Sequence, residues 1–585
     1  MSVTLLPLCL LLGSIQTPQA PKSALEIVPL QHLCGFRPAI EPAMWGSLLR
    51  QPNNGVCHDL LMTGQSTESP IDPEQVVQML GDLNRCDIDA ERLGLTVQGD
   101  NVVVHGELAA VARVRQQVDA ASAVLIRPLQ VEVCVWDATD RDLASPVLGP
   151  REYAQFTANR SPLWRRLATT NSGGAASLDR QRWTRYVYDL DTEVAQKQSV
   201  SRPQTDAFCE GGRVVVRPHL LVGGDDLVLH VQFGLAQRRG VVRSLPTGLP
   251  GTADIELPLL ETCFGGCSAR IVNGGALAVS LRGNASSGGQ IALTVRVMAR
   301  TPPSAAGPAG VGIFPCSALT HPALTQRVSL PNTPPNDDQE GPSDPSPGFG
   351  YMETDQLIDL ARSALDAQAA DSVGIHAAGG YLFVRGEQPD LAAIEALLRS
   401  LQDRLLHNVT LRHEARLSAR DDDAANPPGS APTISAPTIS APTTTTPALL
   451  HEIVVPTLLG REVSVARILE TNVVRGLDIY IAQEAGALDP NVQTLQIGNW
   501  LRARIAPLGS AHHLLLRAVC AQGAIPQART VMPTGGILMP TDVASTRACH
   551  DGPVTSGQSI EHGDGPPVTL EGRSHRSAIT TTLTW

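Results

Sequence analysis

One block of sequence occurs twice in this chain, and the repeat limits the folds that it can adopt. Residues 100–121 read DNVVVHGELAAVARVRQQVDAA, and residues 380–401 read GYLFVRGEQPDLAAIEALLRSL. The Gly-Glu pairs Gly106–Glu107 and Gly386–Glu387 lie 280 residues apart, and at this offset apolar positions match from Val77 to Val131. A register that persists over so long a stretch indicates a duplicated module.

The periodicity of apolar residues predicts the local structure of the module. In the first copy, Val76, Val77, Leu80 and Leu83 have helical spacing after Pro73, a residue suited to a first helical turn. The sequence then predicts a strand, a hairpin turn, a second strand, a helix and a final strand. Their positions are Leu95–Val97, Gly99–Asn101, Val102–His105, Val111–Val118 and Leu129–Val135. This order is typical of a small α+β sandwich with helices on one side of a sheet.

A second repeat follows the first at a slightly different offset. The stretch from Gly211, GGRVVVRPHLLVGGDDLVLHVQF, aligns with the stretch from Ile497, IGNWLRARIAPLGSAHHLLLRAV, at an offset of 286 residues. This alignment pairs Gly212 with Gly498 and predicts strand, turn and strand in both copies. The fold class predicted is therefore α+β and multidomain: two small α/β sandwich modules, each followed by a β-rich domain.

Two stretches rich in Pro, Ser, Thr and Gly divide the chain, because such sequences bury too little apolar surface to offset chain entropy. The predicted segments are a signal peptide (1–20), an N-terminal segment (21–69), module 1 (70–136), a β-rich domain (137–300), a disordered linker (301–350), module 2 (351–415), a second disordered linker (416–448) and a second β-rich domain (449–585).

Composition favours an exported protein and argues against nucleic acid as a partner. Of 585 residues, 42% are apolar and 17% charged, and the formal net charge of −12 is unsuited to nucleic-acid binding. The apolar run from Leu5 to Leu12, with Ala20 before a cleavage point, resembles a secretory signal; a buried N-terminal strand is the alternative. No other stretch is long and apolar enough to predict a membrane helix.

The eleven cysteines are consistent with export. If Cys9 is removed with the signal, ten remain, an even number that suits disulfides. Cys263 and Cys267 are the closest pair, separated by a Gly-Gly turn, and we expect a disulfide hairpin, with two free thiols as the alternative. No histidine at ligand spacing accompanies them, so we expect no metal site.

Four stretches resemble the secretins, the ring-forming outer-membrane proteins of type II and type III secretion and type IV pilus systems. They are the helix-strand-GDNVVVHGE-helix module, LIRPLQVEVCVWDAT, FCEGGRVVVRPHLLVGGDDLVLHVQF and IELPLLETCFGGCSARIVNGGALAVSL. The first is similar to a secretin N-domain, and the others to parts of the secretin β-domain. The sequence departs from the family because a second module interrupts two short β blocks. Residues 137–210 are also expected to lack long amphipathic strands in which apolar and polar residues alternate.

The resemblance implies a non-enzymatic exported envelope protein, in the periplasm or outer membrane, that acts in protein secretion. It also implies partners among envelope or secretion-system proteins, including further copies of the chain. A secreted or surface-displayed binding protein that reuses the modules is the alternative, and an uncharacterised hydrolase is the second alternative. We expect no catalytic residue and no cofactor, because neither a G-x-S-x-G elbow nor a P-loop is present. Trp183 and Tyr186 are predicted partner contacts, with core packing as the alternative.

Overall fold

The computed structural model describes most of the chain between residues 23 and 585. The described residues are 23–30, 37–40, 65–68, 73–99, 101–125, 127–137, 145–195, 198–240, 242–245, 254–283, 290–299, 310–321, 351–366, 373–419, 448–482, 485–508, 511–523, 530–531, 537–538, 543–562, 568–570 and 573–585. Within them the protein is mostly β, with seven helices and several antiparallel sheets. The predicted signal peptide lies outside these residues.

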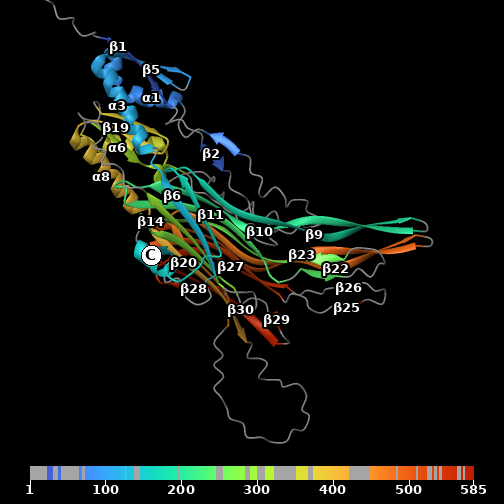
Figure 1. The fold of residues 1–585 in the computed structure, drawn as a ribbon. Coiled ribbons are helices and arrows are strands. Elements are labelled where there is room, and N and C mark those ends of the chain that lie inside the picture. Colours follow the sequence, from blue (N-terminus) through green and yellow to red (C-terminus); the bar gives the residue numbers. More distant parts are fainter. Residues whose placement is uncertain are drawn as a thin grey trace, which may run out of the picture.

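Module 1 is a three-stranded sheet covered by helices (Figure 1, blue). The strand order is β1-β5-β4, and the first helix buries Val76, Leu80 and Leu83, as the spacing predicts. Met79 is buried with them, whereas Val77, which was also predicted to face the core, is only partly buried. Gly99 has a φ of +60° in the turn between β4 and β5, a conformation that favours glycine. The elements are β1 (Ser23–Pro29), α1 (Pro73–Leu83), α2 (Arg85–Asp89), β4 (Leu93–Gln98), β5 (Asn101–Glu107) and α3 (Leu108–Leu125).

Module 2 has the same element order and the same strand order, β17-β19-β18. Its turn glycine, Gly379, has a φ of +56° and stands 280 residues after Gly99. The edge strand β17 and helix α5 lie within the predicted linker 301–350, so residues 310–321 are ordered parts of module 2. The elements are β17 (Val311–Pro315), α5 (Ser317–Thr320), α6 (Thr354–Ser363), β18 (Gly374–Ala378), β19 (Tyr381–Arg385) and α8 (Gln388–Leu405).

The two modules pack against each other. Tyr381 and Phe383 of module 2 belong to the core cluster of module 1. The imidazole Nδ1 of His376 lies 2.8 Å from Asp82 Oδ2, and Arg385 donates a hydrogen bond of 2.9 Å to the carbonyl oxygen of Leu83. Apolar burial and polar contacts therefore both fix the position of one module relative to the other.

Most of the other described residues form two large antiparallel sheets that share one large core cluster (Figure 1). The first has the strand order β27-β24-β23-β22-β14-β11-β10-β9. The second has the order β28-β30-β20-β21-β15-β16-β6-β8, and in addition β7 pairs with β15 and β29 pairs with β30. The strands of the first are β9 (Ala176–Ala195), β10 (Gln198–Leu220), β11 (Asp226–Arg238), β14 (Leu259–Val272), β22 (Glu462–Ala482), β23 (Ala485–Leu508), β24 (Ala511–Gly523) and β27 (Val543–Val554).

The second sheet contains shorter strands and lies against the first. Its members are β6 (Leu129–Asp137), β7 (Val147–Leu148), β8 (Trp164–Thr170), β15 (Ala276–Arg282), β16 (Gln290–Ala299), β20 (Asn408–Ala419), β21 (Ala448–Leu458), β28 (Ser559–His562), β29 (Val568–Leu570) and β30 (Arg573–Thr584). The remaining elements are β2 (Arg37–Ile40), β3 (Gln65–Glu68), α4 (Pro150–Thr157), β12 (Arg243–Leu245), β13 (Ile255–Leu257), β25 (Thr530–Val531) and β26 (Ile537–Leu538).

Three expectations differ from this arrangement. The final strand predicted for each module, β6 or β20, belongs to the second large sheet, and β1 or β17 completes the sheet of the module instead. Residues 137–210 contain β9 and much of β10, so the inference that long strands are missing there was wrong. Tyr186, Tyr188 and Leu190 point inward while their neighbours are more exposed, which is the alternation that the interspersed charges hid. The two β-rich stretches also contribute strands to the same two sheets rather than to one sheet pair each. The predicted domain limits themselves stay predictions.

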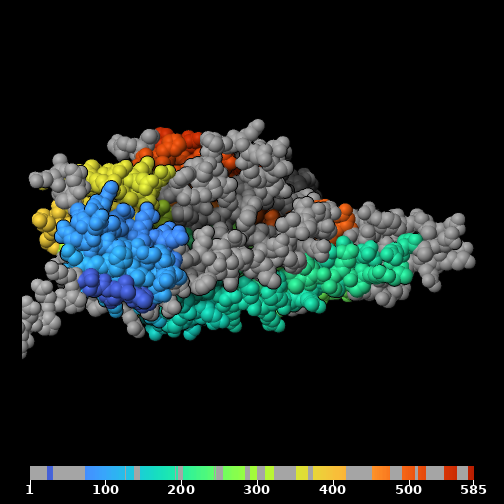
Figure 2. Space-filling model, turned by 90° about the horizontal axis from the view of Figure 1, so that it is seen from above, coloured from blue at the N-terminus to red at the C-terminus, as the bar shows by residue number. Residues whose placement is uncertain are grey.

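Seen from above, the long strands extend away from the modules (Figure 2). The blue module 1 and the yellow and orange parts of module 2 lie at one end of the molecule, and the green strands run toward the other end. The sheet edges are therefore long surfaces along the molecule, and they position the site described next.

Candidate functional site: the unit junction and the sheet ends

The β region consists of two units that meet in both sheets. The first unit comprises the strands from β6 to β16 (residues 129–299), and the second those from β20 to β30 (residues 408–584). In the first sheet β14 pairs with β22, from Leu259 opposite Thr471 to Gly266 opposite Ser464. In the second sheet β15 pairs with β21 through Ser280 and Val454 and the next two pairs. We call these two pairings the unit junction.

A buried ion pair crosses the unit junction. Glu261 of β14 and Arg467 of β22 are each 3% exposed, and Arg467 Nε donates a hydrogen bond of 2.6 Å to Glu261 Oε1. Arg467 Nη1 also donates a bond of 2.6 Å to the carbonyl oxygen of Leu281 in β15, so one guanidinium links both sheets. Arg239 binds the other carboxylate oxygen of Glu261. These contacts satisfy buried charges that would otherwise be costly.

Backbone geometry shows how the two units correspond. Gly211 and Gly498 have φ values of +114° and +155°, and a Cβ at either would clash with the carbonyl oxygen of Arg180 or of Arg467, respectively. Gly498 follows Gly211 by 287 residues, and Arg467 follows Arg180 by the same number. Arg467 therefore corresponds to Arg180, and Gly498 to Gly211. The sequence alignment, which paired Gly498 with Gly212, was one residue out of register.

The correspondence extends across the sheet. Gly211 lies opposite Ala236 and Ala236 opposite Thr262, just as Gly498 lies opposite Ala521 and Ala521 opposite Ser545. Strands β9, β10, β11 and β14 of the first unit thus correspond to β22, β23, β24 and β27 of the second. The strand order of the first sheet is one four-stranded pattern repeated in the same direction.

The second sheet repeats in the same way. At the 280-residue offset Val131 corresponds to Leu411, and these residues lie opposite Ala168 and Val455, respectively. Strand β8 therefore corresponds to β21. The order β28-β30-β20-β21 is followed by β15-β16-β6-β8, which is the same pattern again.

In each sheet, the two terminal strands are the repeat counterparts of the two strands that pair at the unit junction. Strand β22, which pairs with β14, has β9 as its counterpart, and β9 is one terminal strand of the first sheet. The counterpart of β14 is β27, the other terminal strand. Strands β8 and β28 have the same relation in the second sheet. We call β9 with β8 the leading edge, and β27 with β28 the trailing edge.

Apolar side chains are exposed at the leading edge. Leu167 of β8 is 52% exposed, whereas its counterpart at the unit junction, Val454, is 8% exposed. Trp183 of β9 is 49% exposed. An apolar position that is buried where two units meet and exposed where the sheet ends indicates a surface suited to further pairing.

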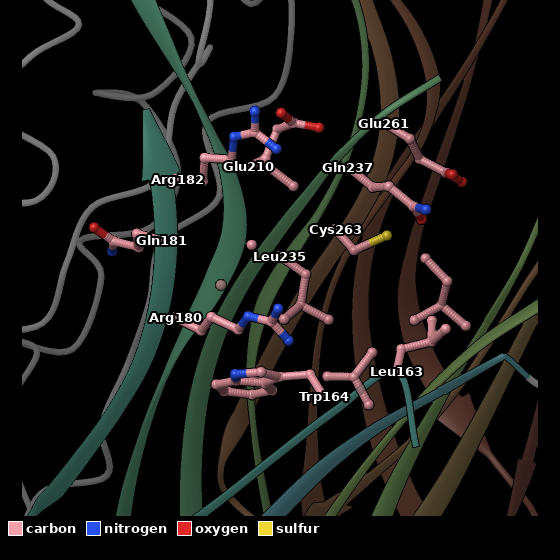
Figure 3. Close-up of a pocket in the computed structure, with 15 residues that line it drawn as sticks. Leu163, Trp164, Arg180, Gln181, Arg182, Glu210, Leu235, Gln237, Glu261 and Cys263 are labelled. Atoms are coloured by element: carbon pink, nitrogen blue, oxygen red, sulfur yellow. The ribbon is translucent and has the colours of Figure 1, made fainter. Parts of the chain in front are cut away.

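A cavity of about 390 Å³ lies between the two sheets beside the leading edge (Figure 3). In Figure 3 the side chain of Arg180 extends over the Trp164 indole, and Cys263 and Glu261 lie on the far side. Burial raises the pKa of the Cys263 thiol to about 12, so this thiol is protonated near neutral pH and a poor nucleophile. Cys263 is therefore unsuited to act as a nucleophile in this cavity.

The described residues contain no cluster of three or more His, Cys, Asp or Glu side chains that could hold a metal ion. Two buried histidines each share a hydrogen bond with a serine: His219 Nδ1 lies 2.8 Å from Ser317 Oγ, and His230 Nδ1 lies 2.6 Å from Ser268 Oγ. Burial holds the pKa of both imidazoles well below the usual value, so both are neutral. In the part of the chain that is described, no helix combines the length and apolarity needed to cross a bilayer.

The structure places the predicted site residues as follows. Cys263 and Cys267 are both free, buried and on the same strand. Extended strand separates positions four residues apart by about 13 Å, well beyond the Cα separation of a disulfide, so this fold does not accommodate the predicted hairpin bond. Tyr186 is a core residue that packs against Tyr188 and Phe208. A partner contact at Trp183 stays a prediction.

The junction residues Glu261 and Arg467 were not found from the sequence, because no local pattern indicates that strands 206 residues apart pair. The signal that could have revealed the units was the shared glycine. Had Gly211 been aligned with Gly498, the repeat would have placed Arg180 and Arg467 at equivalent positions.

Comparison with known proteins gives similarity of fold only. No protein-family model matches the chain, and no curated protein does. Similar solved structures include the Salmonella SPI-1 type III secretion injectisome secretin InvG (8% identity, 49% of this chain and 90% of that chain, TM-score 0.23). Others are Aeromonas hydrophila ExeD (8%, 97% and 90%, 0.19) and a chain of the ETEC pilotin-secretin AspS-GspD complex (8%, 88% and 86%, 0.20). These similarities carry no part of the functional argument, which rests on the sheet edges themselves.

Proposed function

We propose that this chain is a non-enzymatic, exported envelope protein that acts in protein secretion or envelope assembly by adding its sheets to those of partner proteins. The unit junction carries this proposal. At this junction two β units of the same chain are joined edge to edge by backbone pairing in both sheets. Backbone hydrogen bonds supply affinity in such strand addition, and side chains such as Glu261 and Arg467 supply specificity.

The character of the remaining edges supports the same function. The leading edge exposes Leu167 and Trp183 among charged neighbours such as Arg166, and exposed apolar side chains on a terminal strand favour pairing with a further strand. An enzyme would instead be expected to present convergent polar groups with altered pKa values in an accessible pocket. The cavity beside Arg180 contains a protonated thiol and no base paired with it among the described residues.

Cell fractionation of the tagged full-length chain, followed by native mass measurement of the purified protein, tests the proposal. We expect the chain in the envelope fraction, in complexes larger than its own 61.9 kDa. A strict monomer in the medium or cytoplasm, with no envelope protein co-purifying, would overturn it.

A further inference from the structure

We propose that the cavity beside the leading edge is a binding site for a single-chain amphiphile with a carboxylate head group, such as a medium-chain fatty acid. The carboxylate binds Arg180 and the indole N–H of Trp164, and the hydrocarbon chain lies between the two sheets. This site needs no partner protein, so it goes beyond the proposed function.

The cavity has the size and lining of a small-molecule site. Its volume of about 390 Å³ lies within the range of typical ligand pockets, about 300–1,000 Å³. Val135, Leu235 and Ile291 supply apolar walls from both sheets, and each is at most 8% exposed. Protein interiors rarely keep voids much larger than a water molecule, so an apolar space of this size favours an apolar occupant.

Comparison of the two units explains why this space is open in the first unit. At the 287-residue offset of these strands, Gly212 of the cavity wall corresponds to Asn499, and at the 280-residue offset Val133 corresponds to His413. In the second unit Asn499 and His413 are fully buried and contact each other, with His413 Nε2 3.3 Å from Asn499 Oδ1. Gly212 has no side chain and Val133 a smaller one, so the equivalent volume in the first unit is not filled in this way.

The repeat also shows what Arg180 lacks. Its counterpart Arg467 binds the carboxylate of Glu261 and the carbonyl oxygen of Leu281, both at 2.6 Å. Arg180 is exposed, and its guanidinium has no ion pair or hydrogen bond with any residue that the structure describes. A carboxylate on a ligand reproduces at Arg180 the pairing that Arg467 makes with Glu261.

Trp164 supplies a second donor beside Arg180. Its side chain is 7% exposed, and its Nε1–H is buried without a hydrogen-bond partner in the described part of the chain. Figure 3 shows the Arg180 side chain extending over the indole ring. A buried donor without a partner is unfavourable, so an acceptor oxygen of the ligand is stabilised there. Two donors at one end and apolar walls along the rest match a ligand with a single polar end.

The acidic residues of the cavity wall do not neutralise Arg180. Glu261 already binds two arginines, and Glu210 lies 3.7 Å from Arg238. The other cation of the wall, Arg182, lies beside Glu210 in Figure 3. The charge left unpaired in the wall is therefore that of Arg180, and it favours an anion.

The cavity opens to solvent on the side of these donors. Leu163, which lines it, is 51% exposed, and Arg180 is exposed as well. The head group thus stays partly hydrated at the opening while the chain is buried, which avoids the cost of burying a whole charge. A ligand that is polar along its length would instead place polar groups against Val135 and Ile291.

Isothermal titration calorimetry of the full-length chain with octanoate tests the inference. We expect one octanoate to bind per chain. Octan-1-ol, which has the chain but no charge, should bind about five- to tenfold more weakly, and acetate, which has the head group but no chain, should show no measurable binding.

Three variants locate the site. Arg180→Gln should weaken octanoate binding about five- to tenfold and leave the binding of octan-1-ol unchanged. The matched control Arg185→Gln removes an exposed charge of the same strand outside the cavity wall and should change neither. Val135→Phe fills the cavity and should abolish the binding of both ligands. Unchanged circular dichroism spectra establish that the variants fold.

Two results would overturn the inference. One is no binding of octanoate, which would leave a carboxylate side chain of a partner protein as the ligand of Arg180. The other is equal octanoate binding by the unaltered chain and by Arg180→Gln. Neither result affects the proposed function, which is tested separately by cell fractionation and by the mass of the complexes.

Discussion

Replacing Arg467 by methionine should destabilise the β region more than any comparable change at its surface. The substitution removes the guanidinium that binds Glu261 and the carbonyl oxygen of Leu281, both at 2.6 Å. Removing one member of a buried ion pair typically costs about 3–5 kcal/mol, because the remaining charge stays buried. Arg239 continues to bind Glu261, so we expect the lower end, about 3 kcal/mol.

Differential scanning calorimetry measures this effect. For a cooperative unit of about 150–250 residues, 3 kcal/mol corresponds to a decrease in Tm of roughly 6–12 °C. The matched control is Arg502→Met, which breaks a pair with Glu462 inside the second unit. Both partners there are about one-fifth exposed and joined by two hydrogen bonds, so the loss should be about 1–2 kcal/mol, less than for the fully buried pair.

A double variant completes the test. Glu261→Met with Arg467→Met removes the two fully buried charges and leaves Arg239, which is 27% exposed. Replacing a whole buried pair by apolar side chains is often close to neutral. The Tm of the double variant should therefore lie above that of Arg467→Met. Equal Tm values for Arg467→Met and Arg502→Met would refute the reasoning that this pair holds the two units together.

Three other measurements address separate features. Gly498→Ala should lower the Tm by several degrees, because a side chain at a φ of +155° would clash with the Arg467 carbonyl, while Gly557→Ala, at a turn with open space around it, should cost less. Burial lowers the pKa of His413 to about 3 in the folded state. On acidification the His413 imidazole therefore binds a proton in the unfolded state at a higher pH than in the folded state. Stability should then fall by about 1.4 kcal/mol per pH unit as pH drops from about 6.5 toward 3, and His413→Gln should reduce that slope in thermal melts at pH 7 and 4.5. Trp183→Ala should leave the Tm within about 2 °C and weaken partner pull-down; a large loss of Tm with unchanged pull-down would instead assign Trp183 to packing.

The sequence predicted the helices and the hairpin of each module well because their signals are local. Apolar residues at helical spacing, such as Val76 and Leu80, and a turn glycine such as Gly99 each specify structure within a few residues. The same signals recur 280 residues later, and the two sheets have the same strand order.

The β region was less predictable for two physical reasons. Strand β9 has inward residues such as Tyr186 and Leu190 separated by charged ones, and partial burial of both faces blurred the alternation. The pairing of β14 with β22 joins residues about 200 positions apart, and no local preference encodes such a contact. The ion pair between Glu261 and Arg467, and with it the candidate site, therefore became visible only in the fold.

The unit junction closes within a single polypeptide, and this affects how the protein responds to dilution. A contact between tethered partners forms at an effective concentration set by the chain rather than by the number of molecules present. Lowering the protein concentration would weaken contacts with separate partner molecules but would leave β14 paired with β22.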